Sequence, residues 1–216
     1  MPTAILTSCK KVLLSGLTAA GKTTHGQLLA EDLGWSYVDM ASVRKWILGN
    51  HLDMAERDRE WTPTHDTLRA AGPDIDMRAD RLMASVINEH TNVVVDAWLQ
   101  PWIYGEDDAL RVWIESSEEA RVMKGVVAAL RRGEVAAPDF RNVLAAKDNF
   151  SRKHFRQLYS IELFADPAVF DIIIDNSEYI NEPSIVDSDA GIAAFRQVLL
   201  ERATGAIRHI WGADGI

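Results

Sequence analysis

The segment Gly16–Thr23 reads GLTAAGKT and fits the pattern G-x-x-x-x-G-K-[ST] at every fixed position. It lies between an apolar run, Lys11–Ser15, and a helical pattern over Lys22–Leu33. Glycines let the backbone curl so that successive N–H groups point inward, and the following helix directs its positive dipole end at the same place. The segment therefore predicts a strand–loop–helix unit whose loop holds phosphate groups. The predicted nucleotide-binding residues are Gly16, Thr18, Ala19, Ala20, Gly21, Lys22, Thr23 and Thr24.

Three side chains have the types that a bound nucleoside triphosphate requires. Lys22 is placed to reach the β- and γ-phosphates of ATP, and the Thr23 hydroxyl is placed to bind Mg²⁺. Asp96 ends a valine-rich run, where a carboxylate for the same metal ion is expected, although aspartate also ends strands for turn reasons alone. We therefore predict ATP as phosphoryl donor, Mg²⁺ as cofactor, and Thr23 and Asp96 as the metal site.

Short apolar runs alternate along the chain with longer helical patterns, which is typical of βαβ units with a mainly parallel sheet. Unbroken valines before Asp96 suit a strand that is covered on both faces. Ser116, with Glu119 three residues later, predicts a capping box at the start of a helix. Five strands are expected at 11–15, 36–39, 92–96, 109–114 and 170–174, with helices at 22–33, 42–52, from 73, 116–132, within 139–163 and at 189–203.

Composition limits the partners of this chain. Its 216 residues contain 23 Lys and Arg against 32 Asp and Glu, a formal net charge of −9. Such a chain does not hold a polyanion by bulk attraction, so we expect no nucleic acid polymer as partner. No apolar run approaches the length of a membrane span, and the one cysteine, Cys9, favours a reducing compartment. We expect a cytoplasmic protein without membrane contact, monomeric or homodimeric.

After the phosphate loop, five further motifs follow in order along the chain. They read A-x-x-L-G, a P-x-I-D helix, a strand like N-V-V-x-E-G-R, Y-x-I-(D/E)-L and (Y/F)-D-x-x-I-x-(T/N)-S. The matching segments are Ala30–Gly34, Pro73–Asp76, Asn92–Trp98, Tyr159–Leu163 and Phe170–Ser177. This series resembles the cytidylate kinase family of nucleoside monophosphate kinases over nearly the whole chain. The resemblance implies a three-layer α/β/α P-loop kinase fold in one domain over 1–216, with an acceptor-binding region near 35–90 and a helical lid at 121–156. It also implies an ATP-dependent kinase of CMP or dCMP.

Several residues depart from the family pattern, one of them at the strand-end arginine that the resemblance implies to grip the acceptor phosphate. Trp98 stands where the family has an arginine, and Trp cannot form a bidentate contact with an anion. In the lid, Ser151 replaces an aspartate and His154 an arginine, and Lys124 replaces the second arginine of an R-x-x-R pair. Arg44 does match the arginine expected early in the monophosphate-binding helix. The identity of the acceptor is therefore open.

Lid arginines are expected to neutralise charge on the transferring phosphoryl group. Lys and Arg outnumber Asp and Glu in the segment 121–156, a local reversal of the sign of the whole chain. Solvated helix faces are the alternative for each one of these arginines. The predicted catalytic residues are Lys22, Arg121, Arg152 and Arg156, with Arg131 or Arg141 as a substitute.

Asp39 is a candidate base for a hydroxyl acceptor, because it ends the second predicted strand at the edge of the expected crevice. Kinases that resemble shikimate or antibiotic kinases place an aspartate there, but a capping role before Ser42 is equally compatible. Trp98 and Trp102 either stack on an acceptor ring or fill the core. Asp39, Arg44, Trp98 and Trp102 are the predicted substrate-binding residues.

Three functions remain open at this point. The first is a CMP or dCMP kinase, and the second is a kinase of a small hydroxylated metabolite that uses Asp39 as base. The third is a regulator that binds nucleotide without turnover, against which the intact Lys22, Thr23 and Asp96 argue. In the first two, a small-molecule phosphoryl acceptor is the partner.

Overall fold

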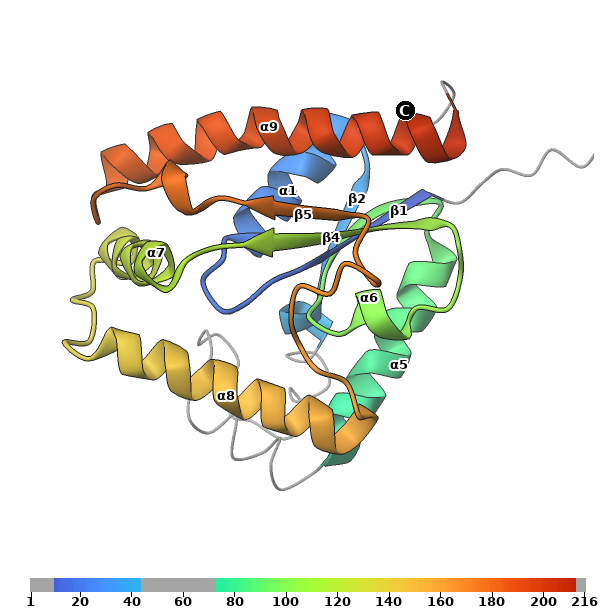
Figure 1. Cartoon of the computed structure of the whole chain (residues 1–216), viewed down its shortest axis with the longest axis horizontal. Coiled ribbons are helices and arrows are strands. Elements are labelled where there is room, and N and C mark those ends of the chain that lie inside the picture. Colours follow the sequence, from blue (N-terminus) through green and yellow to red (C-terminus); the bar gives the residue numbers. More distant parts are fainter. Residues whose placement is uncertain (1–9, 44–72, 213–216) are drawn as a thin grey trace, which may run out of the picture.

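A computed structural model describes residues 10–43 and 73–212 (Figure 1). Its sheet has five strands in the order β2-β3-β1-β4-β5, and every neighbouring pair is parallel. The strands are β1 (Lys10–Ser15), β2 (Ser36–Asp39), β3 (Asn92–Asp96), β4 (Ala109–Glu115) and β5 (Ile172–Asp175). The helices are α1 (Lys22–Leu33), α5 (Pro73–Glu89), α6 (Gln100–Ile103), α7 (Glu118–Arg131), α8 (Phe140–Tyr159), the 3₁₀ turn η1 (Ser177–Tyr179) and α9 (Ile185–Trp211).

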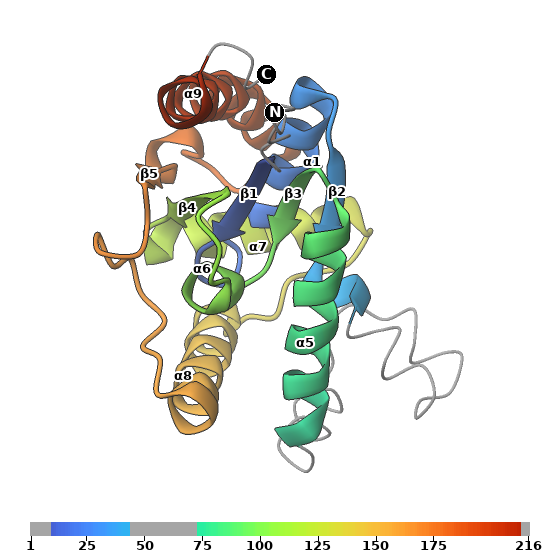
Figure 2. The same cartoon turned by 90° about the vertical axis from the view of Figure 1, so that its right-hand side faces the viewer.

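Helices cover both faces of this sheet, as Figures 1 and 2 show. Side chains alternate between the faces along each strand, so Val12 and Leu14 of β1 pack with α1 and α9, whereas Leu13 packs on the side of α5. Burial of both faces explains the unbroken apolar runs of β1 and β3. The predicted three-layer α/β/α fold is confirmed, and the sheet is wholly parallel within the described residues.

The strand order places the phosphate loop and Asp96 at one edge of the sheet. In β1, Leu14 is in register with Asp96 of β3 on one side and with Val112 of β4 on the other. The chain moves to one side of β1 through β2 and β3 and then to the other side through β4, so a crevice opens at the carboxyl ends next to β1. Helices α7 and α8 lie at this carboxyl side of the sheet (Figure 1).

Several element boundaries differ from the prediction. The side chain of Ser117, not Ser116, accepts the capping hydrogen bond from the Ala120 N–H, so the predicted capping box is wrong. The reason is that the Ser116 hydroxyl is instead an acceptor for the Lys124 ammonium, at 2.9 Å. Helix α9 is longer than predicted, β5 starts later, and α6 was not predicted. The predicted helix at 42–52 lies outside the described residues beyond 43.

Two glycines of α9 give a matched test of its packing. A Cβ atom on Gly191 would lie 1.6 Å from the Tyr179 carbonyl oxygen, whereas a Cβ atom on Gly205 meets nothing within 4 Å. We expect Gly191→Ala to lower the free energy of unfolding by about 3 kcal/mol, because backbone atoms must move to admit the methyl group. Gly205→Ala is expected to raise it by up to about 1 kcal/mol through helix propensity. Urea titration of both variants checks this, and equal stabilities would contradict the close α9–η1 contact.

Candidate active site

Two glycines allow the phosphate loop to follow its path. Gly16 has φ 151°, and a Cβ atom there would lie 2.5 Å from the Ile114 carbonyl oxygen of β4. Gly21, directly before α1, has φ 92°, which disfavours any side chain. Ala19 also has a positive φ, at 61°. The loop therefore turns tightly against β4 and ends on the amino terminus of α1, as its sequence predicts.

Lys22 lies in the centre of this loop. Its ammonium donates hydrogen bonds to the carbonyl oxygens of Gly16 at 2.9 Å and Leu17 at 3.0 Å. Burial lowers the pKa of Lys22, while the nearby carboxylates of Asp96 and Asp148 act in the opposite direction. Phosphate oxygens, which are charged, can replace these neutral carbonyl oxygens as hydrogen-bond acceptors for the Lys22 ammonium.

Thr23 and Asp96 meet at the carboxyl edge of the sheet. The Thr23 hydroxyl donates to Asp96 Oδ2 at 2.6 Å, and the Tyr37 hydroxyl lies 3.4 Å from the same oxygen. Burial raises the pKa of Asp96, and the charge of Lys22 opposes that rise. A hydroxyl and a carboxylate are hard oxygen ligands of the kind Mg²⁺ prefers, so the pair fits this ion. Within the described residues, no group of three or more His, Cys, Asp or Glu side chains could hold a metal ion.

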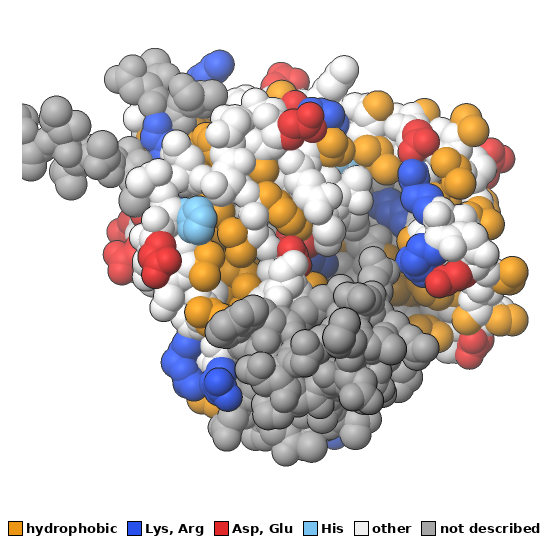
Figure 3. Space-filling model, turned by 180° about the vertical axis from the view of Figure 1, so that it is seen from behind, with side chains coloured by type: hydrophobic (Ala, Val, Ile, Leu, Met, Phe, Trp, Pro, Cys, Tyr) orange, Lys and Arg blue, Asp and Glu red, His pale blue; other side chains and the backbone are white. Residues whose placement is uncertain are grey.

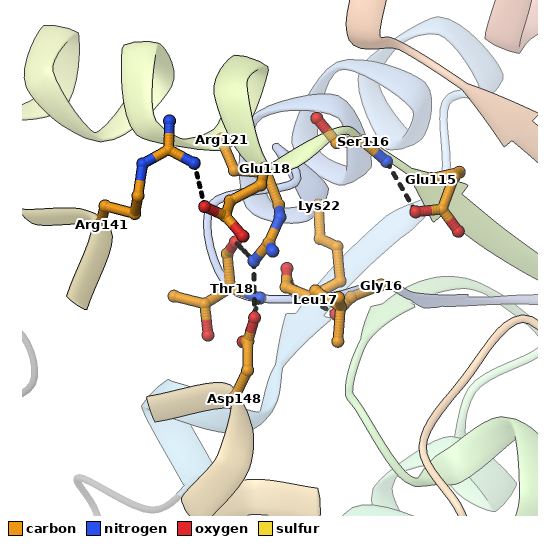
Figure 4. A network of polar contacts seen from close by, with 10 residues as sticks. All are labelled: Gly16, Leu17, Thr18, Lys22, Glu115, Ser116, Glu118, Arg121, Arg141 and Asp148. Carbon is orange, nitrogen blue, oxygen red and sulfur yellow. Dashed lines mark hydrogen bonds and ion pairs between the residues drawn. The ribbon is translucent and has the colours of Figure 1, made fainter. Parts of the chain in front are cut away.

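Arg121 reaches the phosphate loop from α7 (Figure 4). Its NH1 donates to the Thr18 carbonyl oxygen at 3.1 Å and to Asp148 Oδ2 at 2.6 Å. The other Asp148 oxygen accepts from the Thr18 backbone N–H at 3.2 Å. Helices α7 and α8 approach closely because Gly125 has no side chain where the Phe140 ring lies. The structure thus brings one predicted lid arginine to the loop and adds a carboxylate, Asp148, that the sequence analysis did not select.

A cavity of about 410 Å³ opens beside the start of α1, between α7 and α9. Among the described residues, its walls include four Lys and Arg side chains and no Asp or Glu. The four are Lys22, Lys124, Arg131 and Lys147. The face in Figure 3 is hollowed beside blue Lys and Arg side chains. Asn176, after β5, is buried at the cavity and donates from Nδ2 to the Ala20 carbonyl oxygen at 2.8 Å. A cationic cavity next to a phosphate loop is suited to a nucleoside triphosphate.

Lys124 gives this cavity a pH dependence. Burial, with the charge of Arg121, lowers the pKa of Lys124 to about 8, although Asp175 acts in the opposite direction. The Lys124 side chain is therefore mostly charged below about pH 8, and it loses its charge above that pH. We expect ATP affinity to fall about tenfold between pH 7 and pH 9.5, the effect of one charged hydrogen bond. Calorimetry checks this, and Lys124→Arg should bind ATP equally at both pH values; a fall of the same size in that variant would contradict the role of Lys124.

The predicted acceptor residues are placed in different ways. Asp39 is in register with Asp96 on the adjacent strand, but both of its oxygens contact Ser42, at 2.7 Å each, so it caps the helix that begins at 40. Trp98 lies over Lys22, whose ammonium is 5.3 Å from the ring, and it packs near Phe155. Arg44 lies outside the described residues.

Other predicted residues lie in contacts apart from the phosphate loop. The Trp102 ring packs edge-on against Trp113 and Phe170, with centroids 6.2 and 5.0 Å away. The Arg152 guanidinium lies 4.0 Å from the centre of the Phe164 ring. Arg156 is exposed and paired with Glu162 on the surface. Of the substitutes, Arg141 pairs with Glu118, and Arg131 pairs with Asp189 while lining the cavity. The structure brings only Arg121 of the three predicted lid arginines to the loop.

Of the lid residues that depart from the family pattern, His154 and Ser151 are buried, and His154 contacts α5. His154 Nε2 lies 2.6 Å from Asp76 Oδ2, and both side chains are buried. The Tyr159 hydroxyl donates to Asp80 Oδ2 at 2.6 Å. Ser151 is buried as well. These contacts hold α8 against α5 with side chains that lack the arginine fork.

The model of the cytidylate kinase-like family matches residues 12–178, from β1 to the turn after β5. The chain belongs to the cytidylate kinase-like family. It is 26% identical to the cytidylate kinase of Pyrococcus furiosus over 171 residues, which are 79% of this chain and 82% of the relative. It is 27% identical to that of Aeropyrum pernix over 168 residues, 77% of this chain and 90% of the relative. The resemblance found in the motifs is confirmed.

A solved structure of an uncharacterized protein from Eubacterium ventriosum shares the fold, with a TM-score of 0.56 at 12% identity. The similarity covers 89% of this chain and 98% of that one. Membership of the family makes the chain an ATP-dependent kinase of a nucleoside monophosphate or another small molecule, as predicted. Among the described helices, none is both long and apolar enough to cross a membrane.

Asn176 and Asp148 are the site residues that sequence reasoning missed. Asn176 lies in a segment that carried the family resemblance, the (Y/F)-D-x-x-I-x-(T/N)-S match, and Asp148 lies in the predicted lid, 121–156. The sequence therefore indicated in which segment each residue lies. It did not indicate what each side chain contacts, because the partners Ala20, Thr18 and Arg121 lie in distant segments.

Proposed function

We propose that this chain transfers the γ-phosphoryl group of ATP, bound with Mg²⁺, to a pyrimidine nucleoside monophosphate, CMP or dCMP. The observation that carries the donor half is the meeting of Lys22, Thr23 and Asp96 at one edge of the sheet beside a cationic cavity. Membership of a family whose matched region includes the loop, β3 and the lid supports the proposed acceptor.

In this reaction an acceptor oxygen attacks the γ-phosphorus while the bond to the β,γ-bridging oxygen breaks. Lys22 leaves the Gly16 and Leu17 carbonyl groups for the phosphate oxygens, and Arg121 stabilises the charge on the transferring group. Thr23 and Asp96 would hold Mg²⁺, which supplies neutralisation of phosphate charge when bound. The backbone N–H groups of the loop fix the position of the phosphates.

An ADP-release assay over a panel of acceptors tests the proposal. CMP and dCMP are expected to give the fastest release, with other nucleoside monophosphates slower and neutral alcohols silent. Release with neutral alcohols and none with CMP or dCMP would reject the nucleotide acceptor. Silence across the panel in a chain that binds ATP would favour the nucleotide-binding regulator.

A kinase of a small hydroxylated metabolite is the second candidate. Trp98, two residues after β3, stands where the resemblance implies an arginine that grips the acceptor phosphate. In the lid, His154 stands in place of an arginine and is bonded to Asp76. These described positions thus lack the arginine fork that binds a dianion. A hydroxyl acceptor requires a base instead, and Asp39 beside Asp96 is the candidate.

Asp39→Asn separates the two acceptor classes. Asn caps helices about as well as Asp, so the helix that begins at 40 is retained while the base is removed. We expect turnover to fall about a hundredfold or more if the acceptor is a hydroxyl. A phosphate acceptor needs no base, and the loss should then be under about threefold. Steady-state rates with the best acceptor of the panel give the answer, and circular dichroism confirms the fold of the variant.

A further inference from the structure

Arg121 is buried in a site that must keep its charge. Its residue is 7% exposed and Asp148 is 4% exposed. An arginine withdrawn from water to this degree requires an anionic partner, and the only ion pair that the described structure gives it is with Asp148. The long Arg121 side chain is therefore fixed by one carboxylate from α8.

A carboxylate at this place is otherwise unfavourable for a phosphate loop. Asp148 accepts from the Thr18 N–H and is near enough to Lys22 to act on its pKa, so by itself it repels phosphate. The Arg121 guanidinium at 2.6 Å neutralises it. The pair thus adds no net charge to the loop but determines where a guanidinium stands.

Two polar atoms beside this pair await a partner. Arg121 Nε and Thr18 Oγ1 are buried and, in the described part of the chain, neither makes a hydrogen bond. Buried donors without acceptors are unfavourable, and phosphate oxygens accept from both N–H and O–H groups. The contacts around Arg121 are therefore incomplete in a way that a phosphoryl group would satisfy.

We propose that Asp148 is a positioning residue, which holds the Arg121 guanidinium against the phosphate loop in the orientation that meets the transferring phosphoryl group. Asp148 acts through Arg121 and does not itself touch the substrate. Because Arg121 has a phosphoryl group to stabilise only if the chain is the ATP-dependent kinase proposed above, this role rests on that function. An inhibitory role, in which Asp148 blocks the Thr18 N–H, predicts the opposite effects.

Two calorimetric titrations with magnesium test this without knowledge of the acceptor: ADP alone, and ADP with aluminium fluoride, which imitates the transferring phosphoryl group. In Asp148→Asn, we expect the affinity for the aluminium fluoride complex to fall about ten- to a hundredfold, the effect of a misplaced catalytic group. Affinity for ADP alone should change less than threefold. Unchanged affinity for both ligands overturns the proposal, and tighter binding of both overturns it in favour of the inhibitory role.

Three further variants separate positioning from general loss of lid structure. Asp139→Asn, an exposed carboxylate before the same helix, is the matched control and should bind both ligands like the unmodified chain. Asp148→Glu keeps the carboxylate and should recover part of the loss. In an Arg121→Ala background, Asp148→Asn should add little, because its effect passes through Arg121.

Additive losses in the double variant would overturn the proposal in favour of a structural tether. With an acceptor found by the panel assay, Asp148→Asn should lower kcat more than it raises the KM for ATP. A silent panel defeats the proposed kinase function alone, since the two calorimetric titrations still decide the role of Asp148.

Discussion

Lys22→Ala is expected to lower turnover by about a hundred- to a thousandfold, the usual loss when a preorganised charge at the reacting centre is removed. Lys22 is the cation that the loop holds at its centre, bonded to Gly16 and Leu17. Alanine leaves these carbonyl groups facing the phosphates with no positive charge between them. Initial rates of ADP release with saturating acceptor and magnesium measure the effect.

Lys153→Ala is the matched control, because Lys153 is exposed on α8 and its substitution removes the same charge from the chain. It should keep the turnover of the unmodified protein. Full activity in Lys22→Ala would reject the donor site as assigned. An equal loss in both variants would show that net charge, and not the position of the ammonium, is responsible.

Thr23→Val is expected to lower turnover about a hundredfold at fixed magnesium. Valine has nearly the shape of threonine, so the variant removes the hydroxyl that donates to Asp96 at 2.6 Å while keeping the packing at the start of α1. Asp96 then loses a neutral partner in a buried place, and one oxygen ligand for the metal ion is missing. A magnesium titration of the ADP-release rate should show a half-saturating concentration raised about tenfold.

Thr204→Val is the corresponding control, since the Thr204 hydroxyl, within the described ranges, bonds to backbone oxygens of its own helix α9, remote in sequence from the loop. Its magnesium curve should coincide with that of the unmodified chain. If Thr23→Val also keeps the original curve, the proposed metal site is wrong even if the chain is a kinase.

The fold and the donor half could be predicted because their signals are local. A strand, a glycine loop and a helix in direct succession determine the surroundings of Lys22, and the apolar run before Asp96 places that carboxylate on a buried strand. The parallel register then brings Asp96 beside Thr23, as the order of the elements implies.

The lid could not be predicted residue by residue, because its contacts depend on how α7 and α8 pack. Arg121, Arg152 and Arg156 were equivalent candidates in the sequence, yet only Arg121 reaches Thr18. Arg156 pairs with Glu162, six residues away in the chain, and the Arg152 guanidinium lies over the Phe164 ring. The choice depends on the close approach at Gly125, which no periodic pattern reports.

Asp39 and Trp102 show the same limit on the acceptor side. A carboxylate at a strand end can serve as base or cap, and the contacts with Ser42 show the cap without deciding the other role. Trp102 was a candidate for stacking on an acceptor, but its neighbours Trp113 and Phe170 come from β4 and the segment before β5. Such clusters depend on distances between strands that the sequence does not state.

The side-chain amide of Asn176 links the phosphate loop to the wall of the cavity. Its nitrogen donates to the Ala20 carbonyl oxygen of the loop, while its oxygen accepts from Lys124 in the cavity wall. Because one planar group makes both hydrogen bonds, a displacement of Lys124 would be passed to the loop through this side chain. The cavity wall and the phosphate loop are therefore joined through a single residue that lies far from both in the sequence.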